Sequence, residues 1–342
     1  MKAIGCLKYL SLDDPDCFVQ LEIPTPEPTG RDLLVRVKAI SVNPVDTKVR
    51  ASITEATPKP VVLGWDAAGI VEGVGEAAEL FRPGDEVFYA GSRARPGCNC
   101  EYHLVDERIV GRKPGTFTFE EAAALPLTSI TAWEALFDRL GIHPAGASQA
   151  SPKTLLIIGG AGGVGSIAIQ LAKRIAGLRV IATASRLESA SWCKLMGADT
   201  VVDRREPLPR GLNQANVPAV DFILCLNSTE HYVPEMAEII LPQGKICAIV
   251  RSKGDQPLPM NGFFEKSVTF AWEYMFTRPV WQTSDLQEQH KLLEEIGHLV
   301  DRGKIRSTMK EHLGGLSVEA LRRAHAQIES GETIGKIVLS GL

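Results

Sequence analysis

The sequence predicts an α/β protein in which a doubly wound parallel sheet follows a β-rich region. Short apolar segments separated by prolines and glycines fill roughly the first 110 residues. Strands and helices alternate after residue 154, the pattern of parallel strands joined by crossover helices. A glycine-rich loop joins the first of these strands to its helix. With 342 residues, the chain is long enough for two domains.

The N-terminal region consists of short apolar segments with frequent turn signals, which predicts a compact barrel or sandwich. Its strands are expected at 33–40, 67–75, 86–90 and 102–105. Thr118-Phe119-Glu120-Glu121 then fits a capping box that opens an alanine-rich helix. A further helix is expected over 128–140.

The alternating region follows. Strands are expected at 154–158, 179–184, 200–203, 220–226, 245–250 and 267–272. The helix predicted over 164–176 carries Lys173 and Arg174 in its last turn, where cations favour the helix dipole, and Gly177 lies just beyond. The chain is expected to close with helices near 285–302 and 318–330 and a strand at 336–339.

Charge and composition exclude several classes of function. Lys and Arg number 37 against 41 Asp and Glu, and no basic block occurs, so no nucleic-acid or membrane partner is expected. The uncharged stretch Thr154–Ala172 contains five glycines, which indicates strand, turn and helix rather than a membrane span. The chain shows no apolar leader, so the protein is expected to be cytoplasmic. Its seven cysteines are scattered over the chain, so no disulfide framework is expected.

The glycine loop predicts a dinucleotide site. Gly160, Gly162 and Gly165 satisfy GxGxxG between a buried-type strand and an amphipathic helix, and Gly163 and Val164 complete the loop. In this motif the first glycine permits a tight turn, the second lets the backbone approach the pyrophosphate, and the third lets the helix pack on the sheet. The alternative is a tight turn without a ligand.

The residues after the second strand of this region indicate which nucleotide is bound. An NAD site places an acid there for the ribose hydroxyls, but Ala184 is followed by Ser185 and Arg186, and no acid occurs before Glu188. Serine and arginine can bind a 2′-phosphate, which a carboxylate would repel. The sequence therefore favours NADPH, unless Arg186 is simply a solvated loop residue.

Several ordered motifs across the chain resemble the zinc-independent, quinone-oxidoreductase-like branch of the medium-chain dehydrogenase/reductase superfamily. The similar segments are Ser41–Thr47, Leu63–Gly69, Gly84–Val87, Leu125–Glu134, the glycine loop, Gly197–Asp199 and Gly335–Leu339. The resemblance implies a GroES-like catalytic domain over 1–125, to which 275–342 return, interrupted by a Rossmann NADPH-binding domain over 126–274, with the cofactor between them. It also implies a homodimer or homotetramer, in which the edge strand at 267–272 pairs with a second subunit.

The resemblance also allows the zinc-ligand positions of the superfamily to be compared with this chain. Zinc-using members have a cysteine near position 43 and Gly-His-Glu near 64–66, where this chain has Asn43 and Gly64-Trp65-Asp66. Without thiolate and imidazole the usual tetrahedral catalytic site cannot form. The structural zinc lobe needs four close cysteines, and only Cys98 and Cys100 stand there. We therefore expect no metal.

Chemistry without a metal favours hydride donation from NADPH to a carbon that is already electron-poor. Quinones and α,β-unsaturated carbonyls qualify, because the negative charge delocalises onto oxygen. By resemblance, Asn43 and Thr128 should lie near the nicotinamide ribose and amide. Asn227 follows the strand at 220–226, at the carboxyl edge of the sheet where ligands bind.

Asp46 and Lys48 complete the candidate catalytic residues. Relatives that reduce quinones often carry tyrosine where this chain has Lys48. Lys48 could donate to an enolate or favour an anionic substrate, or it could be a surface lysine. Asp46 could orient its neighbours or cap a turn. Residues 272–276 could line an apolar pocket or belong to the core or a subunit interface.

Three hypotheses follow from these features. The first is an NADPH-dependent reductase of quinones or α,β-unsaturated carbonyls. The second is an NADPH-binding sensor or structural module without turnover, since no acid or base is unambiguous. The third is a dehydrogenase or lyase-type enzyme that acts on an anionic substrate held by Lys48. In each case the partner is a small molecule.

Overall fold

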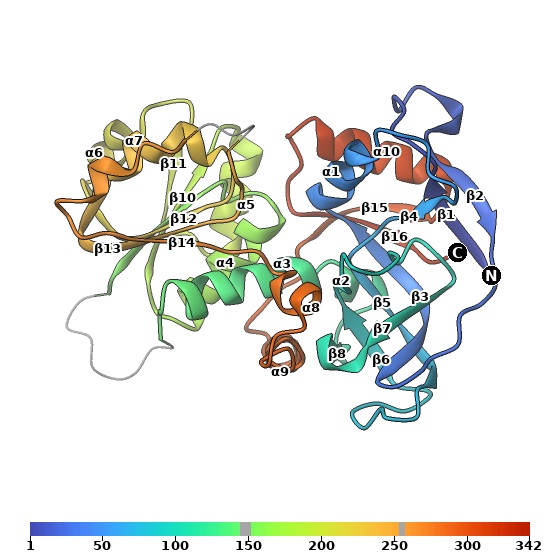
Figure 1. The fold of residues 1–342 in the computed structure, drawn as a ribbon. Coiled ribbons are helices and arrows are strands. Elements are labelled where there is room, and N and C mark those ends of the chain that lie inside the picture. Colours follow the sequence, from blue (N-terminus) through green and yellow to red (C-terminus); the bar gives the residue numbers. More distant parts are fainter. Residues whose placement is uncertain (144–151, 253–256) are drawn as a thin grey trace. The chain divides into compact units, whose positions relative to one another are not determined.

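The computed structural model describes residues 1–143, 152–252 and 257–342 (Figure 1). The chain forms two compact units. Unit 1 consists of Met1–Ile130 and Phe276–Leu342, and unit 2 consists of Thr131–Met275. The chain therefore starts unit 1, builds unit 2 and returns to unit 1, where both termini lie (Figure 1).

Unit 1 contains two sheets. A seven-stranded sheet has the order β15-β16-β3-β5-β6-β8, with β7 also paired to β3, and a three-stranded sheet has the order β2-β1-β4. The strands are β1 Lys2–Cys6, β2 Val19–Glu22, β3 Asp32–Val42, β4 Val61–Val62, β5 Ala67–Val74, β6 Glu86–Tyr89, β7 Tyr102–Asp106, β8 Val110–Arg112, β15 Met309–Gly315 and β16 Lys336–Ser340. The prediction of a β-rich N-terminal region is confirmed.

Strand β3 organises this unit because its eleven residues pair with three other strands. Its side chains alternate between half-buried and buried before they become fully buried at the end. The return strand β16 runs antiparallel to it, with Ile337 opposite Val42. This pairing brings Lys336 next to Asn43, although the two residues are almost 300 positions apart in the sequence.

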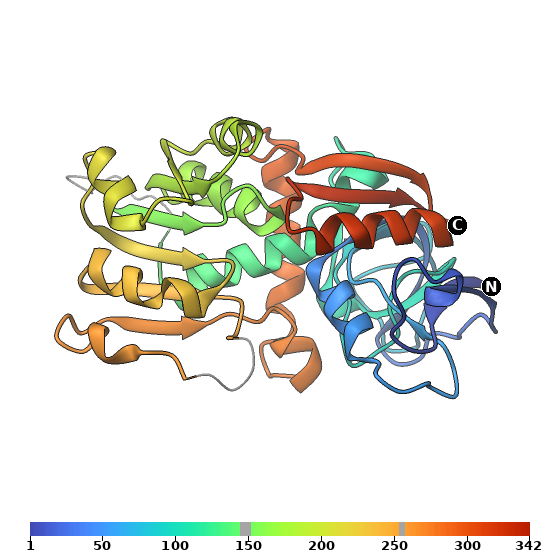
Figure 2. The same cartoon turned by 90° about the horizontal axis from the view of Figure 1, so that it is seen from above.

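Three helices of unit 1, α1, α2 and α10, begin with a capping box or a side-chain cap. Thr118 and Glu121 form both hydrogen bonds of the predicted capping box, each of 3.2 Å. The α-helices are α1 Pro44–Ser52, α2 Phe119–Ala123, α3 Pro126–Trp133, α8 Thr277–Trp281, α9 Glu288–Asp301 and α10 Val318–Glu329. Short 3₁₀ turns lie at Pro15–Cys17 and Glu107–Ile109. Seen from above, α10 runs beside the last two strands of the chain (Figure 2).

Unit 2 is a doubly wound domain with a six-stranded parallel sheet of order β11-β10-β9-β12-β13-β14. The strands are β9 Thr154–Ile158, β10 Arg179–Ala184, β11 Thr200–Asp203, β12 Val220–Cys225, β13 Ile240–Ala248 and β14 Thr269–Trp272. The predicted fold class is thus confirmed. The prediction of a strand at 245–250 was wrong at its start, because Ile240 already pairs with Val220 before a register shift.

Helices cover both faces of this sheet, and the apolar core lies beneath them. They are α4 Gly163–Arg174, α5 Leu187–Met196, α6 Leu208–Gln214 and α7 Thr229–Ile239, with a 3₁₀ turn at Met260–Phe263. Figure 1 shows α6 and α7 on one side of the sheet and α4 on the other. The helix predicted over 128–140 is α-helical only to Trp133 and continues as a π-helix over Glu134–Arg139.

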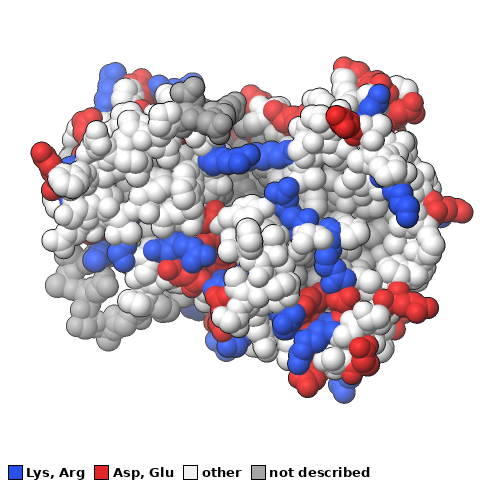
Figure 3. Space-filling model, viewed as in Figure 1, with Lys and Arg blue, Asp and Glu red and all other residues white. Residues whose placement is uncertain are grey.

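Among the described residues no helix is long and apolar enough to cross a membrane. On the face shown in Figure 3, acidic and basic side chains are interspersed with large uncharged areas. All seven cysteines are buried free thiols. In unit 2, β14 is one of the two edge strands of the sheet, and its Trp272 is 46% exposed. The homo-oligomer stays a prediction.

Candidate functional site

The glycine loop follows β9 and leads directly into α4. Gly159 has φ +91°, a backbone conformation that residues with a side chain rarely adopt. This glycine therefore makes the tight turn. The prediction had given that role to Gly160. Position 160 requires glycine for a different reason, because an added Cβ would lie 2.7 Å from the Cβ of Ala182. The turn therefore needs two adjacent glycines, one for its backbone and one for its packing.

The third glycine of the motif sets the distance between the helix and the loop. A Cβ on Gly165 would lie 2.5 Å from the carbonyl oxygen of Gly160 and 2.6 Å from that of Gly159. The first turn of α4 therefore packs directly on the loop backbone. This contact is the close approach that the sequence motif predicts.

Gly162 and the amide groups that follow it remain open. A Cβ on Gly162 would have the carbonyl oxygen of Gly159, 3.9 Å away, as its nearest neighbour. Gly162 is also the N-cap of α4 and offers no side chain to accept hydrogen bonds from the first-turn amides. Open space beside N–H groups at the positive end of a helix dipole fits a diphosphate. Gly163 and Val164 are the first two residues of this helix.

Asn227 lies beside this loop. Its amide nitrogen is 3.2 Å from where a Cβ of Gly159 would stand, and its buried Oδ1 has no hydrogen-bond partner. The loop is braced on the other side by Thr183, whose Oγ1 accepts a 3.0 Å hydrogen bond from the N–H of Gly159. An unsatisfied amide oxygen at the carboxyl edge of the sheet fits a ligand that donates a hydrogen bond.

Ser185 and Arg186 follow β10 at the same edge of the sheet. Ser185 is half-buried and Arg186 is exposed at the N-cap of α5. The N–H of Arg186 donates to Ser189 Oγ over 3.1 Å, which fixes the backbone at the start of that helix. Both residues therefore follow the second strand of unit 2, and their contact with a 2′-phosphate stays a prediction.

Asn43, on unit 1, belongs to a buried polar network that we call the Asp66–Lys336 network, formed by Asn43, Asp46, Asp66 and Lys336. The Asn43 Nδ2 group donates to Asp66 Oδ2 over 2.9 Å and to the carbonyl of Ser41 over 3.2 Å. Its Oδ1 accepts a very short hydrogen bond from Lys336 Nζ. The side chain is only 1% exposed, and both of its polar groups are engaged within the protein.

Asp66 and Lys336 form the ionic centre of this network. Lys336 Nζ lies 2.9 Å from Asp66 Oδ2, and neither residue is more than 3% exposed. The other oxygen, Oδ1, accepts a 2.8 Å hydrogen bond from the N–H of Leu127. Burial raises the pKa of Asp66, while Lys336 and the two hydrogen-bond donors oppose this effect. The buried ion pair, in which each N–H donor of Lys336 and Asn43 has an acceptor, holds β3, β5, α3 and β16 together.

Asp46 is the acidic partner in the cap of α1. Its Oδ2 accepts a 2.6 Å hydrogen bond from the N–H of Asn43, which completes a capping box. Of the two alternatives, the structure shows the capping contact directly. Its Oδ1 is buried without a hydrogen-bond partner, and burial raises the pKa of Asp46 to about 7. The carboxyl can therefore hold a proton near neutral pH.

The residues at these positions do not fit a catalytic zinc ion. Asn43 and Trp65 replace the expected thiolate and imidazole, and the remaining carboxylate, Asp66, is bound by the ammonium of Lys336. Cys98 is a buried thiol whose pKa burial raises well above the ordinary value, so it does not supply a thiolate. Among residues 1–143, 152–252 and 257–342 no group of three or more His, Cys, Asp or Glu side chains could hold a metal ion.

Thr128 and Lys48 differ in their exposure. Thr128 is buried on α3, and its hydroxyl donates to the carbonyl of Leu125 over 3.0 Å. Lys48 is exposed on α1. The candidate catalytic residues and Thr128 therefore fall on unit 1, and the other predicted cofactor residues fall on unit 2.

A second buried acidic cluster lies in unit 2, formed by Glu134, Arg139 and Glu273. Glu134 is completely buried and Glu273 is 2% exposed. Arg139 Nε lies 2.8 Å from Glu273 Oε2, and its Nη2 lies 4.0 Å from Glu134 Oε2. Burial, followed by the charge of Glu134 and a hydrogen bond to it, raises the pKa of Glu273 to about 9. At neutral pH Glu273 is therefore protonated and can donate its hydrogen bond to Glu134.

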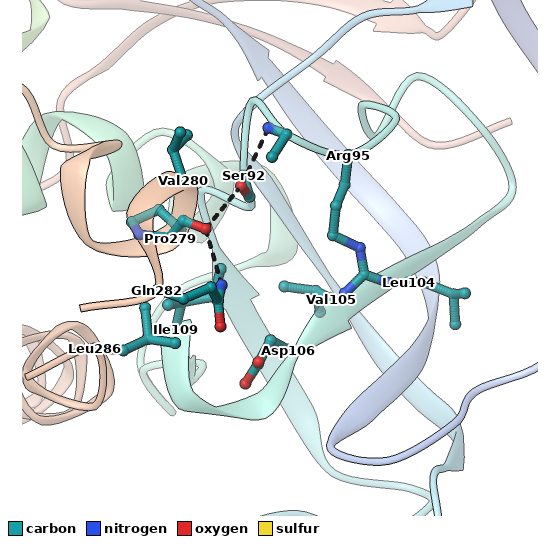
Figure 4. A pocket seen from close by; sticks show the side chains of 11 residues that line it. Ser92, Arg95, Leu104, Val105, Asp106, Ile109, Pro279, Val280, Gln282 and Leu286 are labelled. Carbon is teal, nitrogen blue, oxygen red and sulfur yellow. Dashed lines mark hydrogen bonds between the residues drawn. The ribbon is translucent and has the colours of Figure 1, made fainter. Parts of the chain in front are cut away.

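One small cavity of about 130 Å³ lies in unit 1, where α8 and Leu286 face residues near β7 (Figure 4). It is smaller than ordinary ligand pockets, which measure about 300–1,000 Å³. Its charged side chains are already paired, Arg95 with Asp32 over 2.7 Å and Asp106 with Arg108 over 2.6 Å. We assign it no function.

Sequence reasoning missed the residues that balance the buried charges. In the sequence, Asp66 stands out only as the acid at a zinc position, and Lys336 only as part of the terminal strand motif. A lysine at the start of an otherwise apolar strand was the available signal. Glu134 and Glu273 gave no comparable signal, because they come together only through the fold of unit 2.

Comparisons with known proteins agree with this architecture. Residues 29–133 match the alcohol dehydrogenase GroES-like domain, and residues 196–339 match the zinc-binding dehydrogenase domain. A zinc-type alcohol dehydrogenase-like protein of Staphylococcus aureus (strain MSSA476) is 46% identical over 99% of this chain and all of its own. A solved structure from Rhizobium etli CFN 42, named a "putative zinc-dependent alcohol dehydrogenase protein", has a TM-score of 0.94 and 47% identity, covering 100% of this chain and 98% of its own.

A more distant relative carries a more specific name. The chloroplastic NADPH-dependent alkenal/one oxidoreductase of Arabidopsis thaliana is 30% identical over 72% of this chain and 65% of its own length. A Rossmann-type unit joined to a GroES-like unit defines a nicotinamide-dependent oxidoreductase. The chain belongs to the medium-chain dehydrogenase/reductase family.

Proposed function

We propose that this protein is a zinc-independent reductase that transfers hydride from NADPH to an α,β-unsaturated carbonyl or a quinone. The observation that carries this proposal is the bond between Lys336 and Asp66, which commits the one remaining acid of the zinc positions to an internal cation. A family member built in this way lacks the metal that would ionise an alcohol. An electron-poor carbon accepts hydride without such activation.

The cofactor half of the proposal is supported by the glycine loop and the end of β10. When bound, the reduced nicotinamide would supply the hydride. The open space at Gly162 and the first amides of α4 would bind the diphosphate, and Ser185 with Arg186 would bind the 2′-phosphate. The Arabidopsis relative, named for its use of NADPH with alkenals and enones, points to the same cofactor and substrate class.

The Asp66–Lys336 network would position the start of α1 for the reaction. Because both polar groups of Asn43 are engaged, Asn43 acts by holding the backbone rather than by transferring a proton. Asp46 is the acid in this network whose pKa, about 7, suits proton transfer near neutral pH. Lys48, exposed on the same helix, would favour the developing negative charge on the substrate oxygen.

The test is NADPH oxidation by chelator-treated protein with a 1,4-quinone and a medium-chain 2-alkenal as separate substrates. We expect turnover that survives the chelator and that falls when NADH replaces NADPH. Turnover restored only by added zinc would contradict the proposal. NADPH binding without turnover on either substrate would favour the sensor hypothesis.

The variant Lys48→Met tests the third hypothesis, an enzyme that acts on an anionic substrate. If Lys48 holds an anionic substrate, the Michaelis constant should rise for acidic substrates and stay constant for neutral enones. An equal effect on both substrates would instead assign Lys48 to the reduction itself.

A further inference from the structure

The segment after β11 lies beside the segment that follows β10. Ala184 and Asp203, the last residues of these two parallel strands, are paired in register. The N–H of Arg204 donates a 3.0 Å hydrogen bond to the carbonyl of Ala184, which extends the pairing beyond the strand ends. Arg204 is thereby held next to Ser185, at the carboxyl edge of the sheet.

Arg204 differs from the other arginines near this edge. Arg205 Nη2 lies 2.5 Å from Asp203 Oδ2, and Arg210 Nη1 lies 2.9 Å from Glu206 Oε2. The guanidinium of Arg204 is exposed, and within the described part of the chain it makes no hydrogen bond and no ion pair. A fork of five N–H donors is thus available at a position that the backbone fixes.

The local charge balance also favours an anion. Asp203, the acid nearest in sequence, already accepts hydrogen bonds from Arg205. No acid occurs between Ala184 and Glu188 on the neighbouring segment. Arg186 and Arg204 therefore follow the ends of adjacent strands, and Ser185 stands between β10 and Arg186.

We propose that Arg204 is a further binding residue for the 2′-phosphate of NADPH, acting together with Ser185 and Arg186, and that it determines the preference for NADPH over NADH. The inference rests on the proposed use of NADPH and adds a residue that the motif after β10 does not contain. A phosphate monoester carries a charge of about −1.5 to −2 at pH 7, which one guanidinium neutralises only in part. Two arginines on adjacent strands supply the second charge and a second set of donors.

Binding of nucleotide fragments tests this inference without any turnover. Adenosine 2′,5′-bisphosphate carries the 2′-phosphate and AMP lacks it, so calorimetric titration of both isolates the contact. We expect Arg204→Gln to weaken the bisphosphate by about 10- to 100-fold, the range for loss of a charged hydrogen bond. AMP affinity should change less than about twofold, and NADPH should be weakened far more than NADH.

Arg210→Gln is the matched control, since it removes the same charge from an arginine paired with Glu206. It should leave the ratio of the affinity for adenosine 2′,5′-bisphosphate to the affinity for AMP unchanged. A bisphosphate affinity equal in wild type and Arg204→Gln, or lowered equally by Arg210→Gln, would overturn the inference.

The outcomes also separate this inference from the proposed reaction. If wild type prefers the bisphosphate and Arg204→Gln abolishes the preference, the inference holds even when no quinone or alkenal is reduced. If wild type does not distinguish the two nucleotides, the assignment of NADPH falls and the role of Arg204 falls with it.

Discussion

Both units bury acidic side chains, but they neutralise them in different ways. In unit 1, Asp66 is matched by the buried ammonium of Lys336, 2.9 Å away. In unit 2, Glu134 and Glu273 share one cation, Arg139, which is 33% exposed. The proton on Glu273 supplies the missing charge, because its pKa is raised to about 9. The neutralisation of the buried acid in unit 1 therefore comes from the Lys336 side chain, whereas that in unit 2 also needs a proton on Glu273 and so depends on pH.

The difference follows from where each cluster lies in the chain. Lys336 begins β16, which pairs antiparallel with β3 and so delivers a long side chain beside Asn43 and Asp66. Glu134 begins the π-helix, and Glu273 directly follows β14, on elements that enter and leave unit 2. The acidic pair therefore ties together the first and last segments of that unit.

The largest effect is expected from Lys336→Met. Removing the ammonium leaves Asp66 buried without a counter-charge, which typically costs about 3–5 kcal/mol in the free energy of unfolding. Urea unfolding at pH 7 measures this loss. The loss should shrink at pH 5, because Asp66, whose pKa burial already raises, can then take up a proton.

Two variants make this prediction specific. Lys291→Met removes an exposed lysine paired with Glu288 and should change the free energy of unfolding by less than about 0.5 kcal/mol. The double variant Asp66→Asn/Lys336→Met should be more stable than Lys336→Met alone, because no unpaired charge remains. Additive losses would show that the ion pair is not what stabilises this site.

The second prediction concerns Glu273→Gln, which mimics the protonated acid. A folded-state pKa of about 9, above the ordinary 4.5, means that folded protein keeps a proton that unfolded protein has released. Stability therefore falls as pH rises through this window, by up to about 1.4 kcal/mol per pH unit. Between pH 7 and about 8.5 the wild type should lose stability relative to Glu273→Gln.

Comparison with Glu273→Gln cancels the contribution of the buried thiols, because both proteins contain the same seven. Burial raises the pKa of Cys6 to about 11 and that of Cys247 to about 12, so such thiols add their own pH dependence once unfolded thiols ionise. Urea titrations at four pH values up to 8.5 give the slope for each protein. Parallel slopes for wild type and Glu273→Gln would show that Glu273 is ionised at neutral pH.

These two clusters also show what the sequence can and cannot predict. The alternation of strands and helices in a parallel sheet, the glycine loop and the capping box at Thr118 follow from local patterns, and the structure contains all three. Local patterns also placed Asn43 and Asp46 in one short motif. They could not show that Lys336 saturates Asn43, because that contact depends on the pairing of β16 with β3.

Unit 2 shows a second limit of the sequence. The apolar periodicity over 128–140 predicts one helix, and the change to π-helical hydrogen bonding at Glu134 leaves no mark in that periodicity. The role of Gly159 was missed for a related reason. The motif fixes which positions must be glycine, whereas only the backbone shows which one has the positive φ.

Asp46→Asn gives the third prediction, at lower pH than the second. The pKa of Asp46 is raised from 3.8 to about 7, so this carboxyl lowers the stability of the wild type as pH rises from about 4 to 7. Asparagine keeps an oxygen that can accept the N–H of Asn43 but has no proton to lose. The stability curves of the two proteins should diverge below pH 7 and run parallel above it, whereas divergence above pH 7 would assign a higher pKa to Asp46.

The smallest effect is expected from Arg139→Met, and it tests the comparison most directly. Arg139 Nε lies 2.8 Å from Glu273 Oε2, about as close as Lys336 Nζ lies to Asp66 Oδ2, at 2.9 Å. Loss of the arginine leaves the protonated Glu273 as the remaining partner of Glu134. Because Arg139 is 33% exposed and its Nη2 lies 4.0 Å from Glu134 Oε2, the loss should cost only about 1 kcal/mol at pH 7, against about 3–5 for Lys336→Met. Arg139 opposes the rise in the pKa of Glu273, so its removal should also extend the loss of stability to higher pH. A loss at pH 7 as large as that of Lys336→Met would mean that both units depend on a buried cation, and the contrast between them would disappear.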